Sequence, residues 1–194
     1  GWCYGAAPLV EAISETKGME LIYHPGGMIP KKSIEQSFRQ HILQHDQNIA
    51  ALTGAIFGDD YKARVTSETE FIFDSYITTR AVLVAEEMGV DPHLMIKTIQ
   101  IAHYQKGETV DQLETLKKIA ISMGLDEAIW NEKMQKSKDK VQLTIEESHQ
   151  LMAQQHVSGY PTLAIEKDGQ WTKLSHTQYY GKTAEWKIYL NGLL

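Results

Sequence analysis

The sequence has few cysteines and few basic clusters, and it contains no long apolar run. Its 194 residues include one cysteine, Cys3, which excludes an internal disulfide framework and a zinc site built of cysteines. No stretch approaches the roughly 18 apolar residues that a membrane-spanning helix needs. The formal net charge is -6 and the basic stretches 30–32 and 136–140 are short. We therefore expect neither a nucleic acid nor a membrane as a partner.

Both ends of the chain show the alternation that is typical of an α/β layer. Apolar spacing predicts a helix over 6–18 and a short strand over 19–24. Near the C-terminus, another helix over 140–155 precedes two strands that flank Asp168-Gly169, a strong hairpin signal. A helix over 183–194 closes the chain. The predicted fold class is therefore α/β.

Residues 33–137 show a different pattern, in which helix follows helix. Ser33 with Gln36 resembles a capping box, which predicts that the first helix begins at Ser33. Asp74 is the predicted cap of a second helix, and Asp91 with Pro92 predicts the start of a third. Two further amphipathic stretches follow. We therefore expect an all-helical insertion between the two α/β segments.

Two short stretches carry the chemical signal. Cys3 stands at a predicted helix start, where unpaired N–H groups and the helix dipole favour a thiolate. Pro8 lies inside the same helix, where its ring removes a backbone hydrogen bond and predicts a kink. Tyr160-Pro161 immediately precedes a predicted strand, which makes it a candidate cis peptide.

These stretches resemble the thioredoxin-like, DsbA-type family, in particular its branch of protein-disulfide isomerases. In that family a C-x-x-C pair opens the first helix, and a proline follows the second cysteine as Pro8 follows Cys3. The segment Gly159 to Thr162 is similar to the cis-proline segment of the family. The resemblance covers essentially the whole chain. It implies a thioredoxin-like core over 1–32 and 138–194, with the all-helical insertion over 33–137.

The resemblance also implies a register for the cysteine. Cys3 matches the second, resolving member of the pair, so we expect the attacking cysteine directly before Gly1, in a C-G-W-C motif, and a first strand before that. In the implied reaction, a thiolate attacks a substrate disulfide and Cys3 resolves the mixed disulfide.

Other motif residues are assigned roles by the same resemblance. The backbone of Tyr160, held by Pro161 after Gly159, pairs with the substrate chain as an added strand does. Trp2 and Tyr4 flank the cysteine pair as apolar surface. Gly1 and Trp2, between the two cysteines, tune the redox couple.

Several histidines have weaker signals. His24 ends a predicted strand and His156 precedes the proline segment, so each is a candidate border of the site. His41 and His45 are four residues apart, as metal ligands on one helix face can be, but no third ligand is suggested. We therefore expect no metal and read these two as surface histidines.

Three functions follow from the sequence. The first is a thiol–disulfide oxidoreductase that acts on protein or peptide substrates containing disulfides or thiols. The second is a glutathione-dependent isomerase or transferase of the kappa-class or hydroxychromene-carboxylate isomerase type. The third is a non-catalytic binding module, in which Cys3 is a structural thiol. The "WCY" context favours the first. We expect no bound cofactor, with glutathione as an alternative co-substrate, and a cytoplasmic location, although a periplasmic one also fits.

Overall fold

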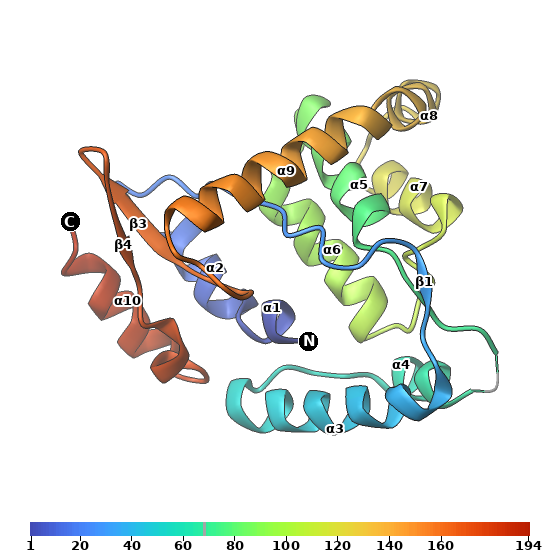
Figure 1. The fold of residues 1–194 in the computed structure, drawn as a ribbon, viewed down its shortest axis with the longest axis horizontal. Coiled ribbons are helices and arrows are strands. Elements are labelled where there is room, and N and C mark those ends of the chain that lie inside the picture. Colours follow the sequence, from blue (N-terminus) through green and yellow to red (C-terminus); the bar gives the residue numbers. More distant parts are fainter. Residues whose placement is uncertain (68) are drawn as a thin grey trace. The chain divides into compact units, whose positions relative to one another are not determined.

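The structure of the protein, a computed structural model, describes residues 1–67 and 69–194 and is built mainly of helices (Figure 1). It consists of two compact units. The first unit comprises Gly1–Tyr23, His45–Ala55 and Gln150–Leu194, and the second comprises His24–Gln44 and Ile56–His149. The predicted domains follow a different division, with boundaries at 32/33 and 137/138, and stay a prediction.

Two long helices contribute to both units. They are α3 (Gln36–Thr53) and α9 (Lys138–Gln154). The other elements of the first unit are α1 (Trp2–Gly5), α2 (Ala7–Ser14), β3 (Ala164–Lys167), β4 (Gln170–Lys173), the 3-10 helix η1 (His176–Tyr179) and α10 (Thr183–Asn191).

The opening helix is interrupted, as Pro8 predicts. Helix α1 ends at Gly5 and α2 begins at Ala7, with Ala6 between them. Pro8 stands in the first turn of α2, where a missing N–H costs least because that group has no partner in the preceding turn. The backbone N–H of Leu9 instead bonds the carbonyl of Ala6 at 2.9 Å. The predicted kink is confirmed as a break between two short helices.

The C-terminal hairpin is confirmed as well. Strands β3 and β4 pair antiparallel, with Lys167 opposite Gln170. Asp168 and Gly169 both have positive φ, 53° and 76°, as a two-residue turn of type I′ requires. The strand predicted over 19–24 does not form, and Ile22 within it is 65% exposed. A strand is held by ladder hydrogen bonds, and no described strand pairs with this segment.

A small core joins α2 to α10 in the first unit. Its buried members are Leu9, Ala12, Leu174, Trp186 and Leu190. The indole Nε1–H of Trp186 donates to the carbonyl of Leu9 at 2.9 Å, so the polar atom of this fully buried ring is satisfied. This bond fixes α10 to α2 across most of the chain length.

The second unit contains most of the predicted insertion. Its other elements are β1 (Lys32–Ser33), α4 (Asp59–Thr66), β2 (Ile72–Phe73), α5 (Ser75–Glu87), α6 (Pro92–Tyr104), α7 (Leu113–Ser122) and α8 (Glu127–Lys136). The predicted helix start at Ser33 is wrong, because Ser33 pairs with Ile72 in a two-stranded ladder and α3 begins at Gln36. The segment 33–137 is therefore not entirely helical.

Helix starts in the second unit follow the predicted caps. The carboxylate of Asp74 accepts hydrogen bonds from the backbone N–H groups of Tyr76 and Ile77 at the start of α5. Asp91 accepts one from His93 at the start of α6, whose first residue is Pro92. Each cap satisfies N–H groups that have no partner within the helix.

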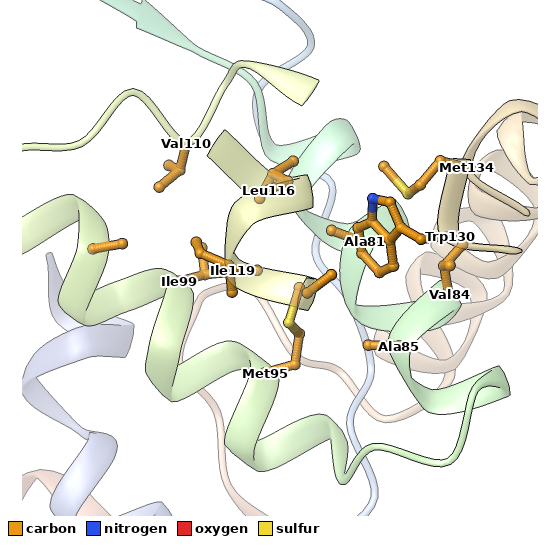
Figure 2. Close-up of a cluster of buried hydrophobic side chains, with 12 residues drawn as sticks. Ala81, Val84, Ala85, Met95, Ile99, Val110, Leu116, Ile119, Trp130 and Met134 are labelled. Carbon is orange, nitrogen blue, oxygen red and sulfur yellow. The ribbon is translucent and has the colours of Figure 1, made fainter. Parts of the chain in front are cut away.

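One core cluster of the second unit is mainly aliphatic, with a single large aromatic ring. Figure 2 shows Trp130 of α8 beside Ala81 of α5, and Ile99 of α6 facing Ile119 of α7. Trp130 is among the most completely buried side chains. None of the helices in the described part of the chain is long and apolar enough to cross a membrane.

Candidate active site

The segment that bears the cysteine lies close against α3. A methyl group on Gly5 would come within 2.6 Å of the Ile49 side chain and within 3.2 Å of the Thr53 hydroxyl. Only glycine allows α1 to approach this part of α3 so closely. The close packing fixes α1, which buries Tyr4 and Gly5 and leaves Cys3 exposed.

The protonation of Cys3 differs from the sequence expectation. The residue is exposed, so a substrate can reach it. The atoms crowded around its sulfur nevertheless raise the pKa of the thiol, because desolvation disfavours the thiolate. The positive charge of the Gly1 amine and, to a smaller extent, a backbone hydrogen bond oppose this only in part. The predicted thiolate at the helix start is therefore wrong for Cys3. Helix α1 has only four residues, so the dipole behind the sulfur is short.

The second chemical segment, between α9 and β3, has the predicted backbone. The Tyr160-Pro161 peptide bond is cis, which confirms the prediction. The Thr162 hydroxyl donates to the carbonyl of Gly159 at 2.7 Å and closes the turn around the proline. The Tyr160 hydroxyl contacts the sulfur of Met152 on α9 at 2.6 Å. The first contact closes the turn on itself, and the second fixes Tyr160 to α9.

A pocket of about 350 Å³ brings the two segments together within the first unit. Trp2 from α1 and Tyr160 with Pro161 from the cis-proline turn contribute to its wall. The remaining lining residues are Leu52, His176, Thr177 and Tyr180. None of the lining residues is Lys, Arg, Asp or Glu, so the wall is aromatic and aliphatic with a few neutral polar groups. Such a wall suits an uncharged part of a ligand.

Two tyrosines of this pocket lie within the electrostatic reach of Cys3. Burial, and secondarily the negative charge of a Cys3 thiolate, raises the pKa of Tyr160, and the same two causes raise the pKa of Tyr180. Tyr180 also stacks on Trp2, with ring centroids 5.8 Å apart and an angle of 18° between the planes. Cys3 is thus near both phenols, one from the cis-proline turn and one from the turn before α10.

His176 lies behind Tyr180 and is 5% exposed. Its Nε2 is 3.3 Å from the Tyr180 hydroxyl, and its Nδ1 is 3.4 Å from the carbonyl of Leu174. Burial lowers the pKa of His176, and the nearby charge of Lys173 lowers it further, while the bond to Leu174 opposes the shift. The ring is therefore neutral near pH 7. A neutral ring that donates from Nδ1 to Leu174 offers the Nε2 lone pair to the Tyr180 hydroxyl.

The structure places three other predicted site residues, Tyr4, Gly1 and Gly159, in different surroundings. Tyr4 is 8% exposed and therefore does not form the predicted apolar surface, since it lies about 200° around the helix from Trp2. Gly1 packs near Asp46 and Ile49 of α3. Gly159 stands in the cis-proline turn.

The two candidate border histidines are both exposed. His156, with φ of 52° in the turn after α9, is not among the residues that line the pocket. His24 belongs to the second unit, so its place at the border of the site stays a prediction.

Sequence reasoning missed four lining residues: Leu52, His176, Thr177 and Tyr180. Leu52 comes from the end of a helix that was assigned to the insertion. The other three lie in the turn between the hairpin and the last helix. A buried histidine followed four residues later by a tyrosine was the available signal there. Without the knowledge that this turn lies beside Trp2, the pattern had no chemical meaning.

No three His, Cys, Asp or Glu side chains within 1–67 and 69–194 are placed to hold a metal ion. The side chains that line the pocket supply two phenols and a neutral imidazole. Cys3 is not among the lining residues, but it directly follows Trp2 in α1.

Comparison with known proteins shows which family has a sequence like this one. The model of the DSBA-like thioredoxin domain matches residues 1–178. The chain belongs to this family. It is a family of thiol–disulfide oxidoreductases, and its fold, a thioredoxin fold with a helical insertion, is the fold that the sequence predicted. No curated protein matches the chain significantly.

Solved structures agree with the family assignment. The cytosolic disulfide reductase DsbM from Pseudomonas aeruginosa is 33% identical with a TM-score of 0.91, over 99% of this chain and 92% of that one. The same protein with GSH gives 31% identity and a TM-score of 0.90, over 99% and 93% of the two chains. A candidate protein disulfide isomerase from Nitrosomonas europaea is 25% identical with a TM-score of 0.77, over 97% and 90%.

Proposed function

We propose that this DSBA-like protein reduces disulfides through a C-G-W-C motif in which Cys3 is the resolving cysteine. The attacking cysteine stands immediately before Gly1 in this proposal. The single observation that carries it is the pocket that unites Trp2 of the motif with the cis Tyr160-Pro161 turn. The raised pKa of Cys3 agrees with the role, because a resolving thiol stays protonated until its turn comes.

The reaction consists of two exchanges. The thiolate of the first cysteine attacks one sulfur of the substrate disulfide, a new S–S bond forms, and the other substrate sulfur leaves as a thiolate that takes up a proton. Cys3 then loses its proton and attacks the sulfur of the first cysteine. A disulfide forms within the motif, and the second substrate thiol departs. The substrate has gained two electrons and two protons, and the enzyme has lost them.

The enzyme must regain those electrons from an external thiol, and glutathione is the proposed donor. Two molecules of glutathione reduce the motif and leave as glutathione disulfide, which balances the cycle. A relative crystallised with GSH supports this choice, and its name as a cytosolic disulfide reductase supports both the reducing direction and a cytosolic location. Peptides whose cysteines are joined in disulfides are the proposed substrates.

The raised pKa of Cys3 has a kinetic consequence. Only the thiolate of Cys3 can resolve the mixed disulfide, and below the pKa of a thiol its thiolate fraction rises about tenfold per pH unit. The mixed disulfide should therefore live longer at pH 6 than at pH 8. Rapid acid quench followed by intact-mass analysis measures that lifetime.

The central test uses the natural protein with its upstream segment intact. Reduction of insulin by glutathione is followed for the wild type and for Cys3→Ser, and loss of at least 90% of turnover in the variant is expected. Tyr179→Phe, which changes a neighbouring ring outside the pocket wall, serves as the matched control and keeps its activity. Equal turnover in Cys3→Ser and wild type would remove Cys3 as the resolving group.

A glutathione-dependent transferase or isomerase remains the second candidate, because a relative binds GSH and the pocket wall is apolar. The encoded residue before Gly1 separates the two functions. Cysteine there supports disulfide reduction, whereas serine supports activation of glutathione for transfer. An assay of glutathione conjugation to a small aromatic electrophile gives the complementary readout: turnover there without insulin reduction favours transfer.

A further inference from the structure

Tyr180 is held from two sides. One face stacks on Trp2 at 5.8 Å, and the ring of His176 lies edge-on to it with centroids 5.6 Å apart and an angle of 76°. The Tyr180 hydroxyl is 3.3 Å from Nε2 of His176. Tyr180 therefore connects the buried histidine to the motif residue that lies next to Cys3 in sequence.

The turn that carries both residues is itself anchored. Tyr179 stacks on Tyr189 of α10, with ring centroids 5.4 Å apart, and packs at a tilt of 51° against Trp186, with centroids 5.1 Å apart. On the other side of Tyr180, Gly181 has φ of 72°, and a methyl group there would lie 3.0 Å from the carbonyl oxygen of Leu52. Because the backbone is fixed on both sides of Tyr180, the ring of this residue can move mainly by rotation about its side-chain torsions.

A histidine suits the position behind Tyr180 better than an apolar residue. Its Nδ1 is bonded to the Leu174 carbonyl, so its neutral ring presents a lone pair at Nε2 toward the phenol. The half-buried Tyr180 phenol, if it lost this acceptor, would turn toward another partner or toward water. The hydrogen bond thus selects the one orientation in which the ring also covers Trp2.

We infer that His176 is a positioning residue that holds Tyr180 against Trp2 and thereby keeps the pocket beside Cys3 in the shape that binds substrate. The inference rests on the proposed function. It adds a determinant of substrate binding that takes no part in the exchange between thiols and disulfides. Trp2 and Tyr180 contact the substrate, and His176 acts through Tyr180. Substrate affinity, and not the thiol exchange itself, depends on the pair.

A set of variants separates positioning from packing. His176→Leu and Tyr180→Phe each remove the hydrogen bond, while His176→Gln keeps an acceptor near the place of Nε2. A net hydrogen bond contributes about 0.5–1.5 kcal/mol, which corresponds to a roughly two- to tenfold change in KM. We expect KM for a peptide disulfide to rise by that factor in the first two, with kcat within twofold of wild type. His176→Gln should restore most of the affinity.

A double variant sharpens the test. Because both single changes remove the same bond, His176→Leu combined with Tyr180→Phe should raise KM little more than either alone. Tyr179→Phe removes the hydroxyl of a neighbouring residue that does not line the pocket and keeps the ring that packs on α10, so it should leave KM unchanged. The inference would be overturned by additive effects of the two changes on KM. It would equally be overturned if His176→Gln did not lower KM back toward the wild-type value, or if KM stayed the same in all the variants.

A spectroscopic readout needs no turnover, so it separates failure of the inference from failure of the proposed function. The near-ultraviolet circular dichroism of the wild type minus that of Trp2→Phe reports the Trp2–Tyr180 stack. The same difference measured in the His176→Leu background should shrink, and in the His176→Gln background it should persist. An unchanged difference in His176→Leu contradicts the inference whatever the enzyme catalyses. A wild type that reduces no disulfide while its stack depends on His176 contradicts only the function.

Discussion

Each unit of the molecule buries a histidine, and the two histidines differ in what surrounds them. His103 of α6 in the second unit lies among Tyr61, Phe71 and Tyr104, and within the described part of the chain its Nδ1 has no hydrogen-bond partner. His176 of the first unit has a partner at each nitrogen. One ring is enclosed in a closed aromatic cluster, and the other lines an open pocket.

The difference teaches that burial of a titratable ring does not by itself mark a site. Burial lowers the pKa of both histidines, and for His103, with the nearby charge of Arg64 adding to the effect, the value falls to about 3. Of these two histidines, His176 is the one hydrogen-bonded to Tyr180, whose ring stacks on Trp2 next to Cys3 in the chain. The following experiments test that contrast, in order of falling expected effect.

The largest expected effect is the loss of folding stability at low pH that follows from the burial of His103. In the unfolded chain this ring binds a proton near pH 6.5, whereas in the folded protein it does so only near pH 3. Stability conferred by the neutral ring is complete above pH 6.5 and is lost as the pH falls toward 3, by about 5 kcal/mol at the limit. Urea unfolding of the wild type at pH 7 and pH 4 measures the loss.

Carboxylates also titrate in this range, so His103→Phe is the control. The wild type should lose more stability than the variant between pH 7 and pH 4, and insulin reduction should be the same in both at pH 7. Parallel losses in the two proteins would show that His103 does not titrate differently on folding. A fall in turnover in the variant would erase the contrast with His176.

Trp186→Phe tests whether the pocket wall rests on α10. The change removes the hydrogen bond to the Leu9 carbonyl and part of a fully buried ring that also packs on Tyr179. We expect a loss of about 2–3 kcal/mol in the free energy of unfolding. Denaturant unfolding at pH 7 measures it, and the exposed ring of Trp171, changed to Phe, provides the matched control.

A loss below 0.5 kcal/mol in Trp186→Phe would mean that the hydrogen bond and the ring volume contribute little. The anchoring of the turn before α10 would then need another explanation.

Gly181→Ala is expected to have a smaller effect on stability and a selective effect on binding. A side chain at φ of 72° is strained, and the added methyl group approaches the Leu52 carbonyl at 3.0 Å. A cost of about 1–2 kcal/mol is expected, together with a raised KM because Tyr180 shifts with the turn. If thermal unfolding reports the loss but KM stays at its wild-type value, the wall and the turn are not coupled.

The smallest effect is expected at His156. This exposed histidine is outside the pocket wall, so His156→Gln should change KM by less than twofold and stability by less than about 0.5 kcal/mol. Steady-state kinetics with the same peptide disulfide checks it. A several-fold change would restore His156 to the border of the site.

The sequence allowed much of this to be predicted, wherever the signal was local. Asp74 and Asp91 cap helices, Asp168-Gly169 turns a hairpin, and Tyr160-Pro161 is cis, because each feature is set by neighbouring residues. Errors occurred where distant pairing decides. Ser33 enters a ladder with Ile72 instead of starting a helix, and the segment 19–24 has no described strand beside it.

The candidate site divides in the same way. Trp2, Cys3 and Pro161 carry motifs that can be recognised in a linear sequence. Tyr180 and His176 do not, because their meaning depends on a stack formed across most of the chain length. The pKa of Cys3 was mispredicted for a related reason, since desolvation depends on packing that a helix-start pattern does not reveal.

One measurement tests the redox role of Cys3 most directly. The natural protein and its Cys3→Ser variant are mixed with glutathione disulfide at pH 8, quenched in acid and weighed by intact mass spectrometry. A resolving Cys3 predicts that the variant stays joined to one glutathione while the wild type passes on to an internal disulfide. A variant that never retains glutathione, or a wild type that retains it just as long, would contradict the account.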